Sequence, residues 1–298
     1  MSFVATLVST PTSPAVDQDL VDRVTQALGQ ESAAKILSPG VAADVRIEGS
    51  DETAAATASR IRDIIGAAPV DVFVQPEKGR RKRLLIADMD STMIRQECID
   101  ELAAELGLKE KISDITERAM RGDIEFEPAL RERVGLLAGL PVSAIGTVLS
   151  NRIVLMPGGR TLVQTMKANG AYCALVSGGF THFTKSVSAM IGFDENRANT
   201  LLEQDGKLTG KVAEPILGRD AKRERLEELV AERALDFSET LAVGDGANDL
   251  AMIERAGAGV AYRAKLAVAE VADFRIDHGD LTALLYLQGY SEKDFVLS

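Results

Sequence analysis

The sequence predicts an α/β protein in two parts, a small N-terminal unit followed by a larger parallel sheet with a helical insertion. Two observations support the sheet and its insertion. Apolar, β-rich runs alternate with helical segments from about residue 171 onward, which is typical of parallel strands joined by crossover helices. Residues from about 97 to 150 are helical in pattern and contain no strand-like run, so we expect them to be inserted after the first strand. A chain of 298 residues is long enough for one large domain or two smaller ones.

The N-terminal unit, residues 1–78, shows patterns in the order strand, helix, strand, strand, helix, strand. Its first helix is expected after the Ser-Pro pair at residues 13–14, and a Pro-Gly turn at residues 39–40 separates the two middle strands. This order predicts a small ferredoxin-like sandwich. The basic stretch EKGRRKR that follows is interpreted as a solvated linker rather than a nucleic-acid patch.

The second part, residues 79–298, is expected to form one domain around the parallel sheet. RLLIAD supplies its first strand, and a helical cap is expected at about residues 97–155. The sheet then resumes with AYCALVSGGF, ETLAVGDGAND, AGAGVAY and ADFRI. Asp205-Gly206, between two strand-like runs, predicts a hairpin that interrupts this alternation.

Composition and charge argue against several classes of partner. The net charge of −11, the aromatic content of 4% and the absence of Trp disfavour a nucleic-acid partner. No apolar run is long enough to span a bilayer, and the N-terminus lacks the basic start of a signal peptide, so we expect a cytoplasmic protein without a membrane partner. Cys98 and Cys173 are interpreted as small core residues of a reducing compartment.

Polar residues follow three of the predicted strands. Residues 88–92 (DMDST), 177–179 (SGG) and 245–249 (DGAND) each end an apolar run and precede a helical segment. In an open parallel sheet, ligands bind outside the carboxyl ends of the strands. These three places are therefore expected to converge on one crevice, provided that their strands are neighbours.

Such a crevice would gather the carboxylates of Asp88, Asp90, Asp245 and Asp249. Crowded carboxylates need a hard cation among them, and oxygen-only ligands suit Mg²⁺. The hydroxyl of Ser177 and the glycine amides after it, expected at a helix N-terminus, would form a seat for an anion. A metal beside an anion seat is the outline of a phosphoryl-transfer site.

Each motif taken alone allows other interpretations. The Asp-Met-Asp pair also fits a nucleotide-sugar transferase, or a helix cap followed by a turn. GDGAND departs from the Gly-x-Gly-x-x-Gly dinucleotide loop, and VSGGF is not a Gly-x-Ser-x-Gly elbow. His182 near Ser177 leaves a Ser-His-Asp hydrolase as a remote alternative. Both histidines, His182 and His278, are more simply interpreted as surface or helix-capping residues.

The conjunction of these motifs is more specific than any one of them. DxDST after a strand, a Ser-Gly-Gly strand end, the lysine-bearing helix start GRDAKRERL and GDGAND occur here in one order. The chain thereby resembles the haloacid dehalogenase superfamily of phosphatases, which implies a Rossmann-like sheet with a helical cap. Over residues 84 to 290 it is similar to the phosphoserine phosphatases of that superfamily, in DMDSTMIRQECIDELA, RGDIEFEPALRERVGLL, LVSGGF, DGKLTG and VGDGANDLAMI.

The resemblance implies a role for each acid at the strand ends. Asp88 would be the nucleophile that forms an aspartyl-phosphate. Asp90 would give a proton to the leaving oxygen and later take one from water. Mg²⁺ would be held by Asp88, the backbone carbonyl of Asp90 and Asp245, with Asp249 in a supporting role.

The same resemblance implies which residues of the sheet would hold the phosphate. Ser177, Gly178 and Gly179 would bind the phosphoryl oxygens. Lys222 would neutralise the nucleophile and the transferring group, and Asn248 would orient the phosphate or the metal shell.

Selectivity is implied to come from the helical cap. Glu97 would bind an ammonium group of the substrate, and Arg133 would bind a carboxylate through two parallel hydrogen bonds. Met120 and Phe126 would line an apolar wall that closes over the site. The implied activity is Mg²⁺-dependent hydrolysis of phosphoserine to serine and phosphate, the last step of serine biosynthesis. A phosphatase of another small phosphomonoester, such as phosphohomoserine, and a serine-responsive protein without catalysis are the alternatives.

The N-terminal unit resembles an ACT domain in the order of its elements, although the loop STPTSPAV is poor in glycine. That resemblance implies either assembly of a homodimer or binding of serine as a feedback inhibitor, and we favour the first.

Overall fold

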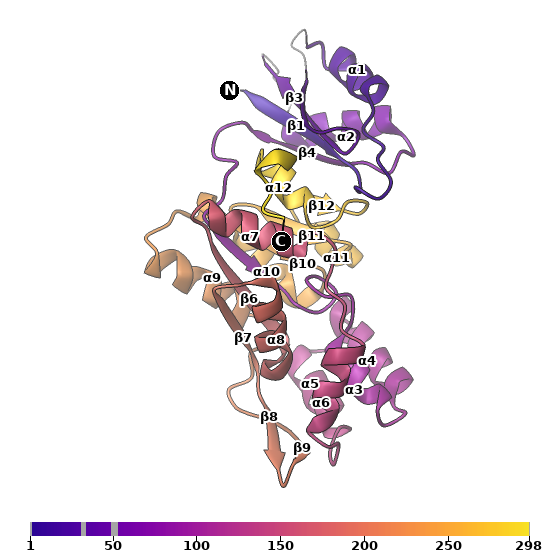
Figure 1. The fold of residues 1–298 in the computed structure, drawn as a ribbon, viewed down its shortest axis with the longest axis vertical. Coiled ribbons are helices and arrows are strands. Elements are labelled where there is room, and N and C mark those ends of the chain that lie inside the picture. The colour runs from indigo at the N-terminus through magenta and orange to yellow at the C-terminus, as the bar shows by residue number, and fades with distance from the viewer. Residues whose placement is uncertain (1, 31–33, 49–52, 298) are drawn as a thin grey trace.

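The computed structural model describes residues 2–30, 34–48 and 53–297, which form two stacked parts (Figure 1). The N-terminal part carries an antiparallel sheet of four strands in the order β2-β3-β1-β4. This order, with a helix after β1 and another after β3, confirms the predicted ferredoxin-like arrangement. Residues 33, 49 and 51–52, at the ends of predicted elements, lie outside the described residues. The elements of this part are β1 (Phe3–Val8), α1 (Gln18–Ala27), β2 (Lys35–Ser38), β3 (Ala42–Ile47), α2 (Ala54–Ile65) and β4 (Asp71–Pro76).

Helix α1 begins later than the sequence predicts. We expected it to start after the Ser-Pro pair at residues 13–14, but its N-cap is Asp17. The Asp17 side chain accepts a hydrogen bond from the Leu20 amide at 2.8 Å, which satisfies one of the free amides of the first turn. The acidic N-cap Asp17, and not the Ser-Pro pair, therefore sets the start of the helix.

Both faces of the N-terminal sheet are covered. Alternate residues of a strand point to opposite faces, and in β1 Ala5 and Leu7 pack with α1 and α2. On the opposite face, Val8, Ala42 and Phe73 belong to the same apolar cluster as the core of the second part. This second face is therefore part of an internal core, so an assembly of two chains would have to use another surface.

Polar contacts fasten the two parts to each other at the same place. Asp71 on β4 accepts hydrogen bonds from the amides of residues 277, 278 and 279, the shortest of them 2.7 Å from Gly279. Arg80 pairs with Asp44 at 2.8 Å in a largely buried position and also donates to the carbonyls of residues 286 and 287. Each of these charged groups is thus paired or hydrogen-bonded, as burial requires.

The second part is built on a parallel sheet of six strands in the order β12-β11-β10-β5-β6-β7. Helices α7, α8 and α12 pack on one face of it and α9, α10 and α11 on the other, which gives three layers. Its strands are β5 (Leu84–Ala87), β6 (Tyr172–Phe180), β7 (Glu195–Asn199), β10 (Thr240–Gly244), β11 (Gly259–Tyr262) and β12 (Phe274–Ile276). Its helices are α7 (Gly159–Ala168), α8 (Thr181–Ile191), α9 (Ala221–Glu232), α10 (Leu250–Arg255), α11 (Leu266–Ala269) and α12 (Ala283–Leu287).

The helical insertion after β5 forms a cap. Its helices are α3 (Cys98–Ala104), α4 (Lys109–Arg121), α5 (Phe126–Gly135) and α6 (Ser143–Asn151). The chain enters and leaves the cap side by side, since Ile94 pairs with Leu155 and the Met156 amide donates to the Met93 carbonyl at 2.9 Å. The predicted insertion is therefore confirmed as four helices joined to the sheet through two adjacent linkers.

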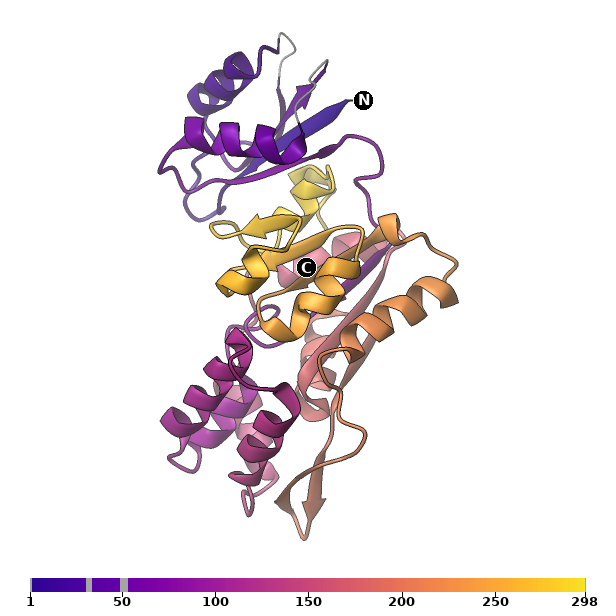
Figure 2. The same ribbon diagram turned by 180° about the vertical axis from the view of Figure 1, so that it is seen from behind.

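The predicted hairpin is formed by β8 (Leu201–Gln204) and β9 (Lys207–Val212). Asp205 and Gly206 both have positive φ, 50° and 73°, as a two-residue turn between twisted strands requires. Figure 2 shows the hairpin reaching down beside the cap. It is bound to the loop between α5 and α6 by backbone hydrogen bonds, among them Gly139 to Leu208 at 2.8 Å and Val142 to Gly206 at 2.9 Å. The cap is thus attached to the rest of the chain at a second place.

No helix among the described residues combines the length and apolar character needed to cross a membrane. Cys98 and Cys173 are both buried and unpaired, in agreement with their interpretation as core residues.

Candidate active site

The three polar strand ends meet because β10, β5 and β6 are neighbours in the sheet. Asp88 follows β5 and its amide donates to the Val243 carbonyl of β10 at 3.1 Å. Asp245 follows β10 directly, and Ser177 lies near the end of β6. Because these neighbouring strands are parallel, all three side chains lie at the carboxyl edge of the sheet.

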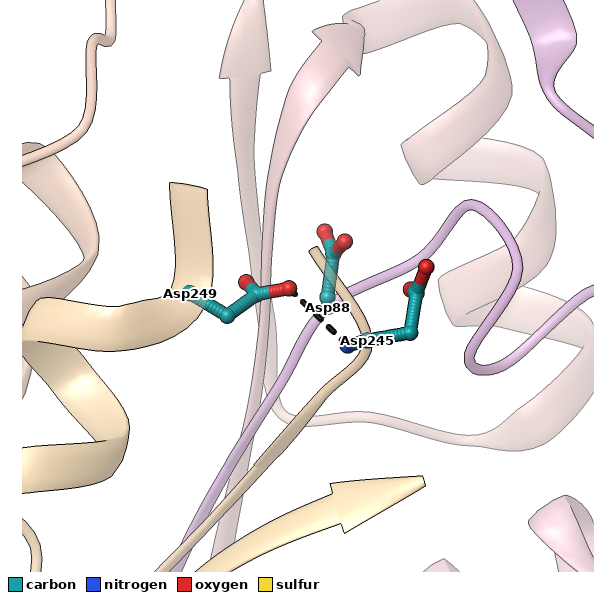
Figure 3. A group of neighbouring side chains, drawn as sticks. All are labelled: Asp88, Asp245 and Asp249. Atoms are coloured by element: carbon teal, nitrogen blue, oxygen red, sulfur yellow. Dashed lines mark hydrogen bonds between the residues drawn. The ribbon is translucent and has the colours of Figure 1, made fainter. Parts of the chain in front are cut away.

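Three buried carboxylates lie together at this edge. Asp88, Asp245 and Asp249 each have an oxygen within 4.8 Å of the others (Figure 3). Burial, and then the charge of Asp249, raise the pKa of Asp88 to about 7, while Lys222 acts in the opposite direction. Burial and the charges of Asp249 and Asp88 also raise the pKa of Asp245 well above its usual range. Such a cluster is stable in its ionised form only when cations compensate it.

Asp249 is already bound by the protein. Its Oδ2 accepts hydrogen bonds from the amides of Asp245 and Gly246, both at 3.1 Å, the first of which is drawn in Figure 3. Its Oδ1 accepts one from Lys222 at 2.5 Å. Both oxygens therefore hold the turn after β10 and the lysine, so Asp249 is less available to a metal ion than Asp88 and Asp245 are.

Lys222 supplies a buried positive charge between two of these acids. It lies in the first turn of α9, is 2% exposed, and its Nζ is 2.6 Å from Asp88 Oδ1 as well as 2.5 Å from Asp249 Oδ1. The contact with Asp88 has the length of an ion pair without the alignment of a hydrogen bond. Burial lowers the pKa of Lys222, but the charges of Asp249 and Asp88 outweigh it and raise the pKa above its usual value. Lys222 is consequently an ammonium group fixed beside Asp88.

Asp90 occupies a different environment from the three clustered acids. Its Oδ1 accepts a hydrogen bond from the Cys98 amide, at the start of cap helix α3, at 3.0 Å. Its Oδ2 faces the backbone of Gly179, where an added β-carbon would lie only 2.7 Å away. Burial raises the pKa of Asp90, and the bonds from Cys98 oppose that effect. Asp90 is thus held by the cap on one side and open toward β6 on the other.

The Ser-Gly-Gly segment lies in strand β6 and not at a helix N-terminus, so that prediction was wrong. Strand β6 continues to Phe180, and α8 begins at Thr181. Asn199 on β7 keeps this backbone extended, since its Nδ2 donates to the Gly178 carbonyl at 2.9 Å. Ser177 is 1% exposed, and its Oγ accepts a hydrogen bond from the Gly179 amide at 2.9 Å. The hydroxyl is therefore held in place by the backbone of the same segment.

A partly open cavity of about 40 Å³ lies between the sheet edge and the cap. Sheet and cap contribute comparable parts of its wall, so a ligand inside would touch both. Lys222, Asp245 and Asp249 lie behind the wall. The residues that line the cavity are Asp88, Asp90, Glu97, Ile99, Ala119, Met120, Phe126, Leu130, Arg133, Ser177, Gly178, Gly179, Phe180 and Asn248.

Two glycines of the sheet edge receive side chains of the cap. A β-carbon at position 178 would lie 2.7 Å from the ring of Phe126, and one at position 246 would lie 2.2 Å from Met120 Cε. Because only glycine leaves this room, the cap is seated directly on the backbone of the sheet. The structure therefore has the cap closed.

Two opposite charges face the cavity from the cap. Glu97 is the N-cap residue of α3 and accepts a hydrogen bond from Ser91 Oγ at 2.6 Å. Arg133 lies in the last turn of α5 and is 6% exposed. Burial raises the pKa of Glu97 and lowers that of Arg133, whereas the charge of Glu97 raises the pKa of Arg133. The two groups are thus suited to a ligand that carries both an anionic and a cationic substituent.

A wider groove of about 910 Å³ adjoins the cavity and shares Ala119, Phe126 and Asn248 with it. It runs between cap helices α4 and α5 and the loop before α9. An ion pair of Arg131 on the cap with Glu214 on that loop crosses between the two walls. This groove therefore lies next to the cavity and shares part of its wall.

His182 does not support a Ser-His-Asp arrangement. Its Nε2 lies 2.8 Å from Glu203 Oε1 on the hairpin, so the ring is paired with the hairpin.

The sequence pattern of the haloacid dehalogenase-like hydrolases matches residues 85–254, more than half of the chain. This chain belongs to the haloacid dehalogenase-like hydrolase family. A curated relative from Archaeoglobus fulgidus, named phosphoserine phosphatase, is 42% identical over 78% of this chain and 67% of the relative. The chain spans about half the length of two further curated relatives, which are phosphoserine phosphatases from Streptomyces coelicolor and Mycobacterium tuberculosis.

Solved structures of haloacid dehalogenase-like hydrolases share the fold. A crystal structure of such a hydrolase from Salmonella enterica aligns with 96% of this chain and 98% of its own, at a TM-score of 0.84 and 30% identity. A substrate-bound phosphoserine phosphatase structure aligns with 69% of this chain and 98% of its own, at a TM-score of 0.67 and 38% identity. The first similarity includes the N-terminal part, and the second does not extend over the whole chain.

Within this haloacid dehalogenase-like hydrolase, the structure brings ten of the predicted site residues to one cavity wall and sets three behind it. Sequence reasoning missed Gly246, although it lies inside the quoted motif GDGAND. It also missed Ile99, Ala119, Leu130 and Phe180 on the wall. Their only signal was the apolar face of a helix or strand, which any core residue shares.

Proposed function

We propose that this chain is a Mg²⁺-dependent phosphoserine phosphatase, which hydrolyses O-phospho-L-serine to L-serine and phosphate in the cytoplasm as the last step of serine biosynthesis. One observation carries the proposal. A single cavity has Asp88 and Ser177 on its sheet side and Glu97 and Arg133 on its cap side. Phosphate, ammonium and carboxylate groups of one small molecule match these partners. The names of the curated relatives support the same substrate.

The donor set at the sheet edge fits Mg²⁺. Asp88 and Asp245 offer carboxylate oxygens that the protein does not otherwise saturate, and the backbone carbonyl of Asp90 would complete the protein ligands. Asp249 supports this set through its hydrogen bonds to the turn. The bound ion would polarise the phosphoryl group and compensate the crowded carboxylates.

In the first step, an oxygen of Asp88 attacks phosphorus and forms an aspartyl-phosphate while the bond from phosphorus to the seryl oxygen breaks. Asp90, with a raised pKa, gives its proton to that oxygen as it leaves. Lys222 stays charged next to Asp88 and attracts the anionic phosphoryl group.

In the second step, Asp90 takes a proton from water, and the resulting hydroxide attacks the aspartyl-phosphate. The bond from phosphorus to Asp88 breaks, which releases phosphate and restores the carboxylate. The Ser177 hydroxyl, held by the Gly179 amide, would bind the phosphoryl oxygens together with the Gly178 amide in both steps, and Asn248 would orient them.

The cap would choose the substrate. Glu97 would bind the ammonium group and Arg133 the carboxylate, while Met120 and Phe126 form the apolar part of the wall. Because the cavity has a volume of only about 40 Å³, a substrate would enter through the adjoining groove with the cap open. The cap would then close over the substrate to exclude water.

A phosphate-release assay tests the proposal. Phosphoserine, phosphohomoserine, phosphoethanolamine and p-nitrophenyl phosphate are compared with Mg²⁺ and after its removal by a chelator. We expect the highest kcat/KM for phosphoserine and loss of turnover without the metal. A preference for phosphohomoserine would mean that phosphohomoserine, and not phosphoserine, is the substrate. Activity that survives chelation would mean that the mechanism does not need the metal.

For the N-terminal part we propose domain bounds of 1–78 and 79–298 and a role in homodimer formation. The ferredoxin-like sheet supports an ACT-like module, but one face of that sheet packs on the second part. Light scattering of the full chain measures the assembly directly, and a monomer at micromolar concentration would contradict it. Serine titration of the full chain by calorimetry tests the alternative role in feedback inhibition.

A further inference from the structure

The guanidinium of Arg133 is held from a neighbouring cap helix. Its Nε donates to the Ala129 carbonyl at 3.1 Å, one turn earlier in the same helix α5. Its Nη1 donates to Thr116 Oγ1 on α4 at 3.0 Å. Of these two bonds, the one to Thr116 fixes the guanidinium relative to another helix. These two bonds use two of the five guanidinium N–H groups, so both N–H groups of Nη2 and one of Nη1 remain for a ligand in the cavity that Arg133 lines.

Thr116 is itself held by an acid on a third cap helix. Its hydroxyl lies 2.8 Å from Asp100 Oδ1 and 3.0 Å from the Ile112 carbonyl. Because the hydroxyl accepts from Arg133, its single proton is free to be donated to Asp100. Ser113 donates to the other oxygen of Asp100 at 2.6 Å. A hydrogen-bonded relay therefore runs from Arg133 on α5 through Thr116 on α4 to Asp100 on α3.

All members of this relay are buried, so breaking one of its hydrogen bonds is costly. Thr116 is 3% exposed, Arg133 6% and Asp100 8%. A buried cation needs a counter-charge and satisfied hydrogen bonds. Asp100 lies one turn after Glu97 on α3, and its charge favours the ionised form of Arg133. Glu97 acts on Arg133 more strongly than Asp100 does, but only Asp100 does so from outside the cavity wall.

We propose that Thr116 and Asp100 are positioning residues that aim the Arg133 guanidinium at the carboxylate of the substrate. The inference rests on the proposed function and deepens it, because it assigns the selectivity for a carboxylate to a relay outside the cavity wall. Neither residue lines the cavity, so neither touches the substrate. Removing the Thr116 hydroxyl would leave Arg133 charged but free to turn away, which weakens binding of a carboxylate and leaves the phosphoryl chemistry intact.

The test compares two substrates in the full-length chain. Phosphoserine carries a carboxylate, whereas phosphoethanolamine has the phosphate and the ammonium group alone. For Thr116→Val we expect KM for phosphoserine to rise about tenfold with kcat within about twofold, and the constants for phosphoethanolamine to stay unchanged. Thr116→Ser keeps the hydroxyl and should restore the wild-type KM. Ser113→Ala, which removes the other partner of Asp100 without touching Arg133, should change KM by less than about twofold.

The outcomes separate this inference from the proposed function. If wild-type enzyme prefers phosphoserine but Thr116→Val impairs both substrates equally, or Thr116→Ser fails to restore KM, the relay has only a structural role and the inference is wrong. If the wild-type enzyme shows no preference for phosphoserine over phosphoethanolamine, the proposed function falls as well. Thermal unfolding verifies that each variant is folded. Should Thr116→Val not fold, Thr116→Ala, which also removes the hydroxyl, must show the same selective rise in KM.

Discussion

The sheet side and the cap side of the cavity hold their charged groups in different ways. On the sheet side, Asp88 and Asp245 follow adjacent parallel strands, and backbone amides fix the turn through Asp249. On the cap side, Glu97 and Arg133 stand on separate helices and depend on other side chains for their position. Backbone-fixed groups suit a reaction common to a whole family, and groups held by side chains suit a selectivity that changes between members. Variants on the two sides should therefore affect kcat and KM separately.

The largest effect is expected on the sheet side, from Asp88→Asn. An amide is a far poorer nucleophile than a carboxylate, so kcat for every phosphomonoester should fall by on the order of 10³-fold or more. The fold should survive, because the change removes one charge from a crowded cluster. Phosphate release measures the activity, and thermal unfolding serves as the control. Turnover that stays near the wild-type value would contradict the nucleophilic role and with it the assignment of the two sides.

On the cap side, Arg133→Ala should raise KM for phosphoserine about 100-fold, since a buried, charge-assisted contact is lost. KM for p-nitrophenyl phosphate, which has no carboxylate, should change little. Steady-state kinetics with both substrates gives the comparison. Equal effects on the two substrates would mean that the cap does not read an amino-acid carboxylate.

Gly246→Ala probes the contact between the two sides. The new methyl group would meet Met120 Cε on the cap and Asn248 Oδ1 on the sheet edge, so the two sides would fit together less closely, and kcat/KM for phosphoserine should fall about tenfold. Gly146→Ala on α6 is the matched control, because nothing lies within 4 Å of a β-carbon there. The control should keep its activity and gain about 0.5–1 kcal/mol in unfolding free energy. Full activity of Gly246→Ala would show that the closed contact is dispensable.

The smallest effect concerns acid stability of the cap. Burial raises the pKa of Glu101, but Lys109 at 2.6 Å and Arg152 at 3.3 Å outweigh burial and lower it. A carboxyl whose folded pKa is lowered stabilises the fold above its unfolded pKa of 4.5, and this contribution is lost as pH falls through the folded pKa. Glu101→Gln should therefore lower the unfolding free energy by about 1 kcal/mol at pH 7 and by less near pH 3. Urea unfolding at both pH values measures it, and a difference that does not depend on pH would exclude the ion pairs as its source.

The sequence predicts correctly those parts of the molecule whose local pattern also determines their position in the fold. Asp88, Ser177 and Asp245 end apolar runs, and the carboxyl ends of neighbouring parallel strands must meet. Strand β7 was missed as a separate strand because ENRAN has no apolar run, and its pairing with β6 comes from the sheet and not from propensity. The extended backbone at Gly178 was missed for a similar reason, since a side chain 21 positions away holds it. The relay from Thr116 to Asp100 joins two helices whose relative placement no local pattern encodes.

The shared face of the N-terminal sheet has a consequence for how the chain unfolds. Val8, Ala42 and Phe73 belong to the cluster that also contains core residues of the parallel sheet, and the ring of Phe73 meets Phe274 edge-on at 5.9 Å. Separating the two parts would expose this apolar area to water and break the hydrogen bonds of Asp71. Neither part can therefore melt without destabilising the other, and heating the intact chain should give a single cooperative heat-absorption peak rather than two.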